Sequence, residues 1–272
     1  MAESVHTLAE ALGLTRREHL ALVGAGGKTS LLLALAGELQ GAGKRVLAST
    51  TTKMWHQEAS QLGSVLFLGS TPTWREDLRK GAGEKGLVFL AERRLDSGKV
   101  QGVAPEVLDA LFREEDVDYL VVEADGSAGH PLKAPAAHEP VIPRTATGVV
   151  ALMGLEALGR PAGPETVFRP EVFQQVTGIQ PGEVLRPVSL TRLFLDSEGL
   201  FKGSPGSSRR VVFLNKRDLL SGEEGAMELA RRILGDTRSL VERVVIGSLR
   251  QKVYTITRRA DGGDLFQNRG TR

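Results

Sequence analysis

Short apolar segments rich in valine and leucine alternate with longer stretches of mixed polarity along most of the chain. Apolar runs of roughly four to eight residues bounded by turn residues are typical of buried strands. Strands buried on both faces form parallel sheets, which helices must cover on each side. We therefore predict an α/β fold with a mostly parallel sheet and helices on both faces. The predicted strands are residues 20–23, 45–49, 64–68, 86–90, 118–123, 149–153, 210–214 and 241–246.

Other stretches show helical or irregular patterns. Residues 5–14 predict a short amphipathic helix, and a leucine-rich helix should run from residue 31 to about residue 43. A third helix is expected at residues 105–114, with a proline at an early position. Residues 154–208 contain no convincing central strand and predict a helical and loop insertion beside the sheet. Residues 258–272 form a polar, glycine-rich tail.

A glycine-rich turn joins the first predicted strand to the leucine-rich helix. Strand, glycine turn and helix in this order are the context of a phosphate-binding loop, or P-loop. Glycines let backbone N–H groups surround an anion at the positive end of the helix. We predict that Lys28 reaches the β- and γ-phosphates and that the Thr29 hydroxyl binds Mg²⁺. The predicted nucleotide-binding residues of the loop are Gly24, Ala25, Gly26, Gly27, Lys28, Thr29 and Ser30.

This loop is shorter than the full P-loop pattern, which has four residues between its first glycine and its Gly-Lys pair. That spacing would require a glycine at position 22, where this chain has Leu22. Instead, only two residues separate Gly24 from Gly27. The alternative interpretation is a glycine-rich strand-to-helix turn with an incidental lysine. Signals elsewhere in the chain favour the nucleotide interpretation.

A second signal follows the apolar segment at residues 118–123, which ends in Glu123-Ala124-Asp125-Gly126. Carboxylates two positions apart point to the same side of a continuing strand, so Glu123 and Asp125 could share one Mg²⁺ with Thr29. The alternative is a strand that runs into an Asp-Gly turn. After a P-loop in the same chain, we favour a magnesium site at these residues.

A third signal is Asn215-Lys216-Arg217-Asp218, which follows the apolar segment at residues 210–214. Asn-Lys-x-Asp resembles the guanine-recognition element of GTP-binding proteins: the carboxylate of Asp218 can accept two N–H groups of guanine. The amide of Asn215 can bind the purine edge, and the stem of Lys216 can pack along the base. Ser248, after the last predicted strand, would complete the base pocket. The alternative is a turn capped by Asp218.

Further polar residues have more open roles. Thr50, Thr51, Thr52 and Lys53 end the second predicted strand, where they could touch Mg²⁺, phosphate or an acceptor or form a solvated turn. His130, Lys133 and His138 follow the acidic segment, where one of them could serve as an acid, a base or a phosphate contact. The predicted catalytic residues are Lys28, Asp125 and Lys133.

Composition limits the alternatives. The 272 residues suffice for one large α/β domain, and 41% hydrophobic residues can form a substantial core. The net charge of +2 does not argue for nucleic acid, and the lack of cysteine excludes disulfides and cysteine-ligated metals. No apolar run approaches the roughly 18 residues of a membrane span, and we see no signal peptide. We expect a cytoplasmic protein with neither nucleic acid nor membrane as partner and with no indicated oligomeric state.

Taken in order, these segments resemble the selenium-dependent hydroxylase accessory proteins of the YqeC family. The most specific part is residues 131–135 (Pro-Leu-Lys-Ala-Pro) with residues 138–143 (His-Glu-Pro-Val-Ile-Pro), because a generic nucleotide fold does not require it. The resemblance covers about residues 20–248, and the short glycine loop fits the family. It implies an accessory role in the maturation of molybdenum hydroxylases that carry labile selenium, with such a hydroxylase or its cofactor as partner.

The leading hypothesis is a single domain, residues 1–272, that binds Mg²⁺ and a purine nucleotide and hydrolyses it or transfers a phosphoryl group. GTP is favoured over ATP only because of Asn215 and Asp218. One alternative is a holder or chaperone for a molybdenum cofactor or a client hydroxylase, without turnover. Another is a small-molecule kinase in which His130, Lys133 and the threonine cluster line an acceptor pocket.

Overall fold

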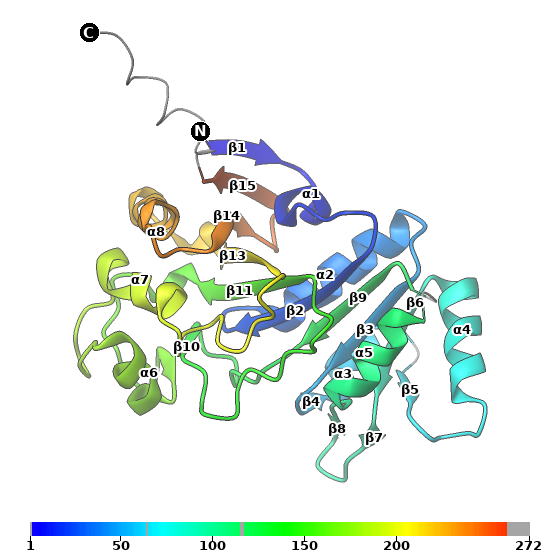
Figure 1. The fold of residues 1–272 in the computed structure, drawn as a ribbon. Coiled ribbons are helices and arrows are strands. Elements are labelled where there is room, and N and C mark those ends of the chain that lie inside the picture. Colours follow the sequence, from blue (N-terminus) through cyan, green and yellow to red (C-terminus); the bar gives the residue numbers. More distant parts are fainter. Residues whose placement is uncertain (1, 64, 115–116, 260–272) are drawn as a thin grey trace, which may run out of the picture.

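A computed structural model of the chain describes residues 2–63, 65–114 and 117–259 (Figure 1). Its centre is a ten-stranded sheet. β15 runs antiparallel to both of its neighbours, β1 and β14, and all the other neighbouring strands pair in parallel. In pairing order, the strands are β1 (Ala2–Val5), β15 (Val253–Arg258), β14 (Val241–Ser248), β13 (Arg209–Asn215), β11 (Gly148–Gly154), β2 (Glu18–Gly24), β9 (Tyr119–Glu123), β3 (Val46–Thr50), β6 (Leu87–Ala91) and β5 (Val65–Phe67).

Helices connect the strands and cover the sheet. Each α-helix long enough to pack on the sheet contributes an apolar stripe to one of its two faces. The helices are α1 (Leu8–Leu12), α2 (Lys28–Gly41), α3 (His56–Ala59), α4 (Trp74–Lys85), α5 (Pro105–Arg113), α6 (Pro170–Thr177), α7 (Pro187–Leu195) and α8 (Glu224–Gly235), with short 3₁₀ turns η1 (Ser60–Leu62), η2 (Leu155–Ala157) and η3 (Arg217–Leu219).

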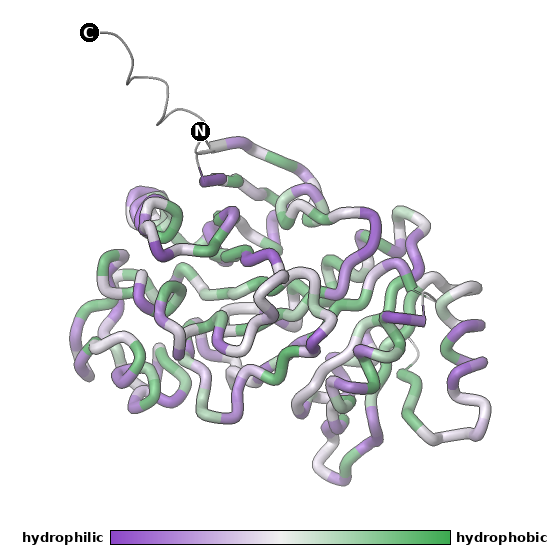
Figure 2. Tube along the Cα trace, viewed as in Figure 1, coloured by the Kyte–Doolittle hydropathy of each residue, from purple (hydrophilic) through white to green (hydrophobic). Residues whose placement is uncertain are grey.

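Alternate residues of each central strand enter opposite cores. In β2, Leu20 and Leu22 pack with the leucines of α1 and α2, whereas Ala21 and Val23 pack on the other face. That second face is covered by α4 beside β5 and β6, by α5 in the core it shares with β3 and β9, and by α6, α7 and α8 near β11, β13 and β14. Figure 2 shows the central strands as largely hydrophobic and α4 as largely hydrophilic, as expected for buried strands and an exposed helix.

Two smaller sheets lie beside the main one. β4 (Met54–Trp55), β8 (Lys99–Gln101) and β7 (Arg93–Arg94) form an antiparallel sheet that extends below the main sheet in Figure 1. β10 (Leu132–Lys133) pairs in parallel with β12 (Val167–Phe168), which lies in the insertion between β11 and β13. Both small sheets bring side chains to the same edge of the main sheet, as described below.

The predicted fold class, a mostly parallel α/β sheet with helices on both faces, is confirmed. Residues 154–208 indeed hold helices and loops, including α6 and α7. The prediction of a helix over residues 5–14 was wrong at its start, because Val5 belongs to β1 and pairs with Tyr254 of β15. Arg258 ends β15, and the rest of the predicted tail lies largely outside the described residues, which end at residue 259. No helix in the described ranges has the length and apolarity needed to cross a membrane.

Candidate nucleotide-binding site

The predicted site residues lie at the carboxyl ends of adjacent parallel strands. Glu123, the last residue of β9, is in register with Leu22 of β2 and with Thr50 of β3. On the other side of β2, Gly154 of β11 is in register with Asn215 of β13. Ligands of open α/β sheets bind at this edge, because loops and helix N-termini gather there.

The glycine loop between β2 and α2 requires glycine at specific positions. Gly24, Gly26 and Gly27 have φ angles of 94°, 76° and 123°, which side-chain-bearing residues rarely adopt. A Cβ on Gly24 would lie 2.3 Å from the carbonyl oxygen of Leu152, and one on Gly26 would lie 2.1 Å from the amide nitrogen of Gly154. The loop therefore packs directly against the end of β11, and that contact requires glycine at positions 24 and 26.

Amides of the loop hold it in place through hydrogen bonds to neighbouring segments. The N–H of Ala25 donates to the Leu152 carbonyl at 3.0 Å, and that of Gly26 donates to the His130 carbonyl at 3.0 Å. The first amides of a helix have no acceptor within the helix, and the N-cap residue of α2, Gly27, supplies no side-chain cap. The N-terminus of the 14-residue helix α2 can therefore bind an anion.

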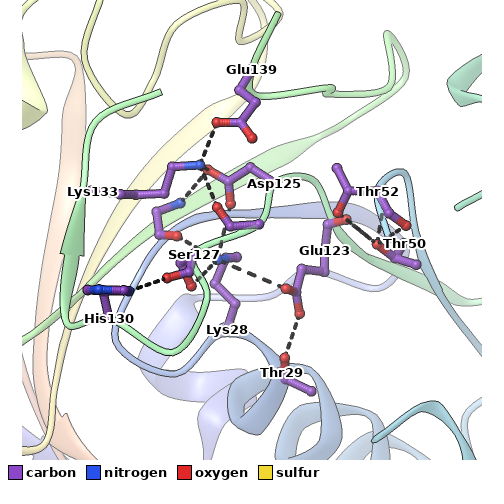
Figure 3. Close-up of polar contacts among 12 residues, drawn as sticks. Lys28, Thr29, Thr50, Thr52, Glu123, Asp125, Ser127, His130, Lys133 and Glu139 are labelled. Atoms are coloured by element: carbon purple, nitrogen blue, oxygen red, sulfur yellow. Dashed lines mark hydrogen bonds and ion pairs between the residues drawn. The ribbon is translucent and has the colours of Figure 1, made fainter. Parts of the chain in front are cut away.

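Lys28 is buried at this helix start and faces two carboxylates (Figure 3). Its Nζ lies 3.2 Å from Oδ1 of Asp125 and 4.0 Å from Oε1 of Glu123. It also donates to the Gly24 carbonyl at 2.5 Å and to the Ser127 hydroxyl at 3.2 Å. The structure thus brings together Lys28, Glu123 and Asp125, three residues that the sequence singled out separately.

The predicted magnesium ligands are also adjacent. The Thr29 hydroxyl donates to Oε2 of Glu123 at 2.8 Å, and Oδ1 of Asp125, though close to Lys28, has no hydrogen-bond donor within the described chain. Burial raises the pKa of Glu123, while Lys28 and the Thr29 hydroxyl oppose that rise. A hydroxyl and one or two carboxylates fit Mg²⁺, which takes its remaining ligands from phosphate and water. The described residues contain no cluster of three His, Cys, Asp or Glu side chains that could hold a metal by themselves.

A buried chain of ion pairs extends from Asp125 away from the loop. Oδ2 of Asp125 accepts from the Gly24 N–H at 3.0 Å and lies 3.1 Å from Nζ of Lys133. Lys133 also contacts Oε2 of Glu139 at 2.7 Å, and Nη1 of Arg169 contacts the same oxygen at 2.8 Å. Burial would raise the pKa of Glu139, but the hydrogen bond and charge of Lys133 hold it below its ordinary value.

Lys133 therefore donates hydrogen bonds to Glu139 and to the Gly126 carbonyl, both at 2.7 Å, and forms an ion pair with Asp125 at 3.1 Å. Its side chain is fully buried. This geometry holds Lys133 against Asp125 and the start of the loop. The sequence placed Lys133 among the catalytic residues. Its contacts in the structure fit a positioning role instead.

Asn215 connects the glycine loop to the loop after β14. Its Nδ2 donates to the Gly26 carbonyl at 2.9 Å, and its Oδ1 accepts from the Leu249 N–H at 3.2 Å. A Cβ on Gly27 would lie 2.6 Å from that Nδ2, so this contact also restricts position 27 to glycine. The amide of Asn215 thus fixes the loops on which a base pocket depends.

Asp218 and Ser248 lie together, as predicted. The Ser248 hydroxyl donates to Asp218 and lowers its pKa, and Nε of Arg250 lies 3.4 Å from Oδ2 of Asp218. Lys216 has a left-handed φ of 66° and pairs with Glu156. A pocket of about 360 Å³ opens beside these residues. It is lined by Ser30, Ala34, Asn215, Lys216, Asp218, Leu219, Leu249 and Arg250.

The other polar residues have mainly structural contacts. The Thr50 hydroxyl donates to the Glu123 carbonyl at 3.0 Å, and the Thr51 hydroxyl donates to the Val141 carbonyl at 2.9 Å. The ring of His130 contacts the carbonyls of Ser127 and Pro164, and its side chain borders the start of α2. His138 is exposed.

Three pockets follow one another along this edge. The base pocket just described shares Ser30 and Lys216 with a phosphate pocket of about 250 Å³ at the start of α2. The phosphate pocket in turn shares Thr29 and Glu123 with a larger pocket of about 480 Å³. Sequence patterns missed several residues that line this third pocket or support it, because they come together only through tertiary packing of the small sheets, α3, the loop after β10 and the insertion. These residues are Trp55, Glu58, Lys99, Glu139, Phe168 and Arg169.

Comparisons with solved structures give only distant similarities. The signal recognition particle 54 kDa protein of Aeropyrum pernix K1, in complex with GDP, matches 86% of this chain at 15% identity with a TM-score of 0.38. Chloroplast FtsY of Physcomitrella patens matches 88% at 14% identity with a TM-score of 0.35. The chain spans 42% and 62% of the lengths of these two proteins.

Comparisons with protein sequences give a closer relationship. The uncharacterized protein YqeC of Escherichia coli K12 is 39% identical over 198 residues, which cover 72% of this chain and 75% of that protein. The family model described as YqeC protein matches residues 20–171, which include the glycine loop, the acidic segment and the Lys133–Glu139 pair. The chain therefore belongs to the YqeC family.

Proposed function

We propose that this protein binds Mg²⁺ together with a purine nucleotide, with GTP favoured over ATP, and hydrolyses the nucleotide or transfers its terminal phosphoryl group. The observation that carries the proposal is the cluster of Lys28, Thr29, Glu123 and Asp125 at the start of α2. This cluster combines a cation, a hydroxyl, two carboxylates and a helix N-terminus beside one pocket. Such a combination is suited to a nucleotide phosphate and its magnesium ion.

The residues would have separate tasks. The amides at the start of α2 and the ammonium of Lys28 would stabilise phosphate charge, and Asp125 would orient Lys28. Thr29 and Glu123, with Asp125 nearby, would hold Mg²⁺, which supplies charge neutralisation at the phosphates when bound. Because Lys28 is buried, its charge acts in surroundings of low polarity, where electrostatic interactions are strong.

Guanine preference is proposed from the base pocket. Asp218 presents a carboxylate whose lowered pKa keeps it ionised near neutral pH, as acceptance of two guanine N–H groups requires. Lys216 lines both the base pocket and the phosphate pocket, so its stem can pack beside a base joined to the bound phosphates. Asn215 would act by fixing the two loops.

In the cell, we propose an accessory role in maturing selenium-dependent molybdenum hydroxylases, in the cytoplasm, as the family resemblance suggests. The whole chain, residues 1–272, would act as one nucleotide-binding unit. The presence of a third pocket beside the phosphate pocket favours transfer or coupled handling of a second molecule over simple nucleotide storage.

The test is release of phosphate from GTP with Mg²⁺, measured together with nucleotide affinity for the wild type and Lys28→Ala. We expect Lys28→Ala to lose roughly a hundredfold or more in nucleotide affinity, because it removes a buried, charge-assisted phosphate contact. Lys202→Ala, which removes the half-buried partner of the exposed Glu198, is the matched control and should change nothing. Undiminished nucleotide affinity in Lys28→Ala would contradict the assignment of the loop.

A further inference from the structure

The third pocket, called here the Trp55 pocket, lies beside the phosphate pocket, and most of its lining residues have no assigned role in nucleotide binding. It holds about 480 Å³ and shares Thr29, Glu123 and Ser127 with the phosphate pocket. A molecule in the Trp55 pocket would therefore lie next to the phosphates of a nucleotide bound at the start of α2. Other parts of its wall come from β4, β8 and β12, outside the main sheet, and from the loop that follows β9.

Two aromatic side chains line this pocket from different parts of the fold. Trp55 ends β4 and is 52% exposed, which is unusual for so large an apolar side chain. Phe168 ends β12, in the insertion between β11 and β13, and is half-buried. Exposed aromatic rings in a pocket offer flat faces on which a planar molecule can stack.

Three cationic side chains accompany the rings: Lys53, Lys99 and Arg169 all line the Trp55 pocket. Nζ of Lys99 lies 4.7 Å from the centre of the Trp55 ring, and Cζ of Arg169 lies 4.7 Å from the centre of the Phe168 ring. Each aromatic wall thus carries a positive charge beside it. This pairing suits a ligand that combines a flat ring with an anionic group.

The acidic side chains of the pocket lie at its other end. Glu58 and Glu123 line both the Trp55 pocket and the phosphate pocket, whereas the three cations line only the Trp55 pocket. The carboxylates therefore mark the boundary with the phosphate pocket, where Mg²⁺ is proposed. The cations lie at the end away from it, so an anionic group of the ligand would be directed away from the nucleotide.

Arg169 is held in place by the buried ion pairs of the site. Its guanidinium contacts Glu139, which contacts Lys133, which in turn contacts Asp125 beside Lys28. Its φ of 58° is a left-handed conformation that is costly for a residue with a side chain and is more common at functional sites. The pocket wall and the glycine loop thus belong to one connected polar network.

We propose that the Trp55 pocket binds a planar aromatic or heteroaromatic molecule bearing a phosphate or carboxylate group, as the second ligand of the nucleotide-dependent reaction. Its role as a second ligand rests on the proposed function, whereas binding to the pocket does not require it. Trp55 and Phe168 supply the stacking faces, and Lys99 with Lys53 supplies the accessible positive charge.

The experiment is a calorimetric titration of the full chain with 1-naphthyl phosphate, 1-naphthoate and uncharged 1-naphthol, with GDP and Mg²⁺ present to fill the phosphate pocket. The three probes share one ring, so their affinities isolate the anionic group and distinguish phosphate from carboxylate. Each titration is repeated on Trp55→Ala and Lys99→Gln. The control variant is Lys80→Gln, on the exposed face of α4 and outside the pocket.

We expect at least one anionic probe to bind more tightly than 1-naphthol. Trp55→Ala should lower the affinity for that probe by roughly tenfold through lost stacking, and Lys99→Gln should lower it by roughly threefold. Lys80→Gln should have no effect. The proposal is overturned if the anionic probes bind no better than 1-naphthol, or if Trp55→Ala binds them like the wild type.

Nucleotide titrations on the same variants separate this proposal from the proposed function. Trp55→Ala should keep wild-type affinity for GDP, because Trp55 lines neither the base pocket nor the phosphate pocket. If no nucleotide binds to the wild type, the proposed function fails. The probe titrations are then repeated on Lys28→Ala, in which the phosphate pocket lacks Lys28. Binding of an anionic probe to this variant still decides whether the Trp55 pocket binds an aromatic anion.

Discussion

Replacing Lys133 with methionine tests the buried ion-pair chain that supports the glycine loop. Methionine is similar in length and apolar, so the change removes the charge and its three hydrogen-bond donors without leaving a large cavity. In the wild type, Lys133 lies 2.7 Å from Glu139, 3.1 Å from Asp125 and 2.7 Å from the Gly126 carbonyl. Glu139 and the Gly126 carbonyl would each lose a hydrogen bond, and Asp125 would lose an ion pair.

The expected loss of unfolding free energy depends on the partners that Asp125 and Glu139 keep in the variant. Breaking a buried ion pair by removing one partner costs about 3–5 kcal/mol in unfolding free energy, because a charge is left uncompensated. Here Asp125 keeps Lys28 and the Gly24 N–H, and Glu139 keeps Arg169 at 2.8 Å. We therefore expect the lower end of the range, about 3 kcal/mol.

Urea denaturation at neutral pH measures this loss, with Lys202→Met as the matched control. Lys202 pairs with Glu198 at 2.6 Å on the surface, and its removal should cost less than about 0.5 kcal/mol. Lys133 lowers the pKa of Glu139, so in Lys133→Met this carboxyl should take up a proton more readily. The difference in unfolding free energy between Lys133→Met and the wild type should therefore shrink as the pH falls through about 4.5, the ordinary pKa of Glu139. Equal midpoints for the two variants would refute the reasoning.

Three other perturbations address the loop, a buried histidine and the base pocket. Gly26→Ala should lower the unfolding free energy by about 2–4 kcal/mol, because φ is 76° and its Cβ would meet the backbone of β11. Gly37→Ala, in open space on α2, should instead raise it by about 0.5–1 kcal/mol, and equal midpoints would contradict this account. Burial lowers the pKa of His19 from 6.5 to about 3, so its stabilising contribution is complete above pH 6.5 and lost as the pH falls. Between pH 6.5 and about pH 5 the wild type should lose about 2 kcal/mol of unfolding free energy, and His19→Gln should not. Parallel pH profiles of the two proteins in urea denaturation would exclude this effect. Asp218→Asn should reduce the preference for GTP over ATP by roughly tenfold in competition binding, whereas unchanged selectivity would make Asp218 a turn cap.

Much of the fold was predictable because it depends on local apolar patterns. The segment at residues 118–123 had to be a buried strand, and its polar end placed Glu123 at the carboxyl edge beside the glycine loop. The strands β1 and β15, at one end of the sheet, escaped prediction because β15 is not a continuous apolar run and β1 is four residues long. Their pairing joins the two ends of the described chain, which no local pattern indicates.

The candidate site was predictable only where one segment carries several of its residues. The spacing from Gly24 to Thr29 is local, and the structure places these residues beside Glu123 and Asp125 as expected. Arg169 and Trp55 could not be predicted, because they reach the site through tertiary packing of the insertion and the small sheet. The burial of Lys133 was also not evident, since it depends on Glu139 and Asp125 together.

The most direct test of the central claim is a calorimetric titration of the wild-type chain with GDP, GTP, ADP and ATP, each with and without Mg²⁺. The account predicts binding that requires Lys28, strengthens with Mg²⁺ for the triphosphates through Thr29 and Glu123, and favours guanine over adenine. Binding of none of the four nucleotides, with or without Mg²⁺, would contradict it.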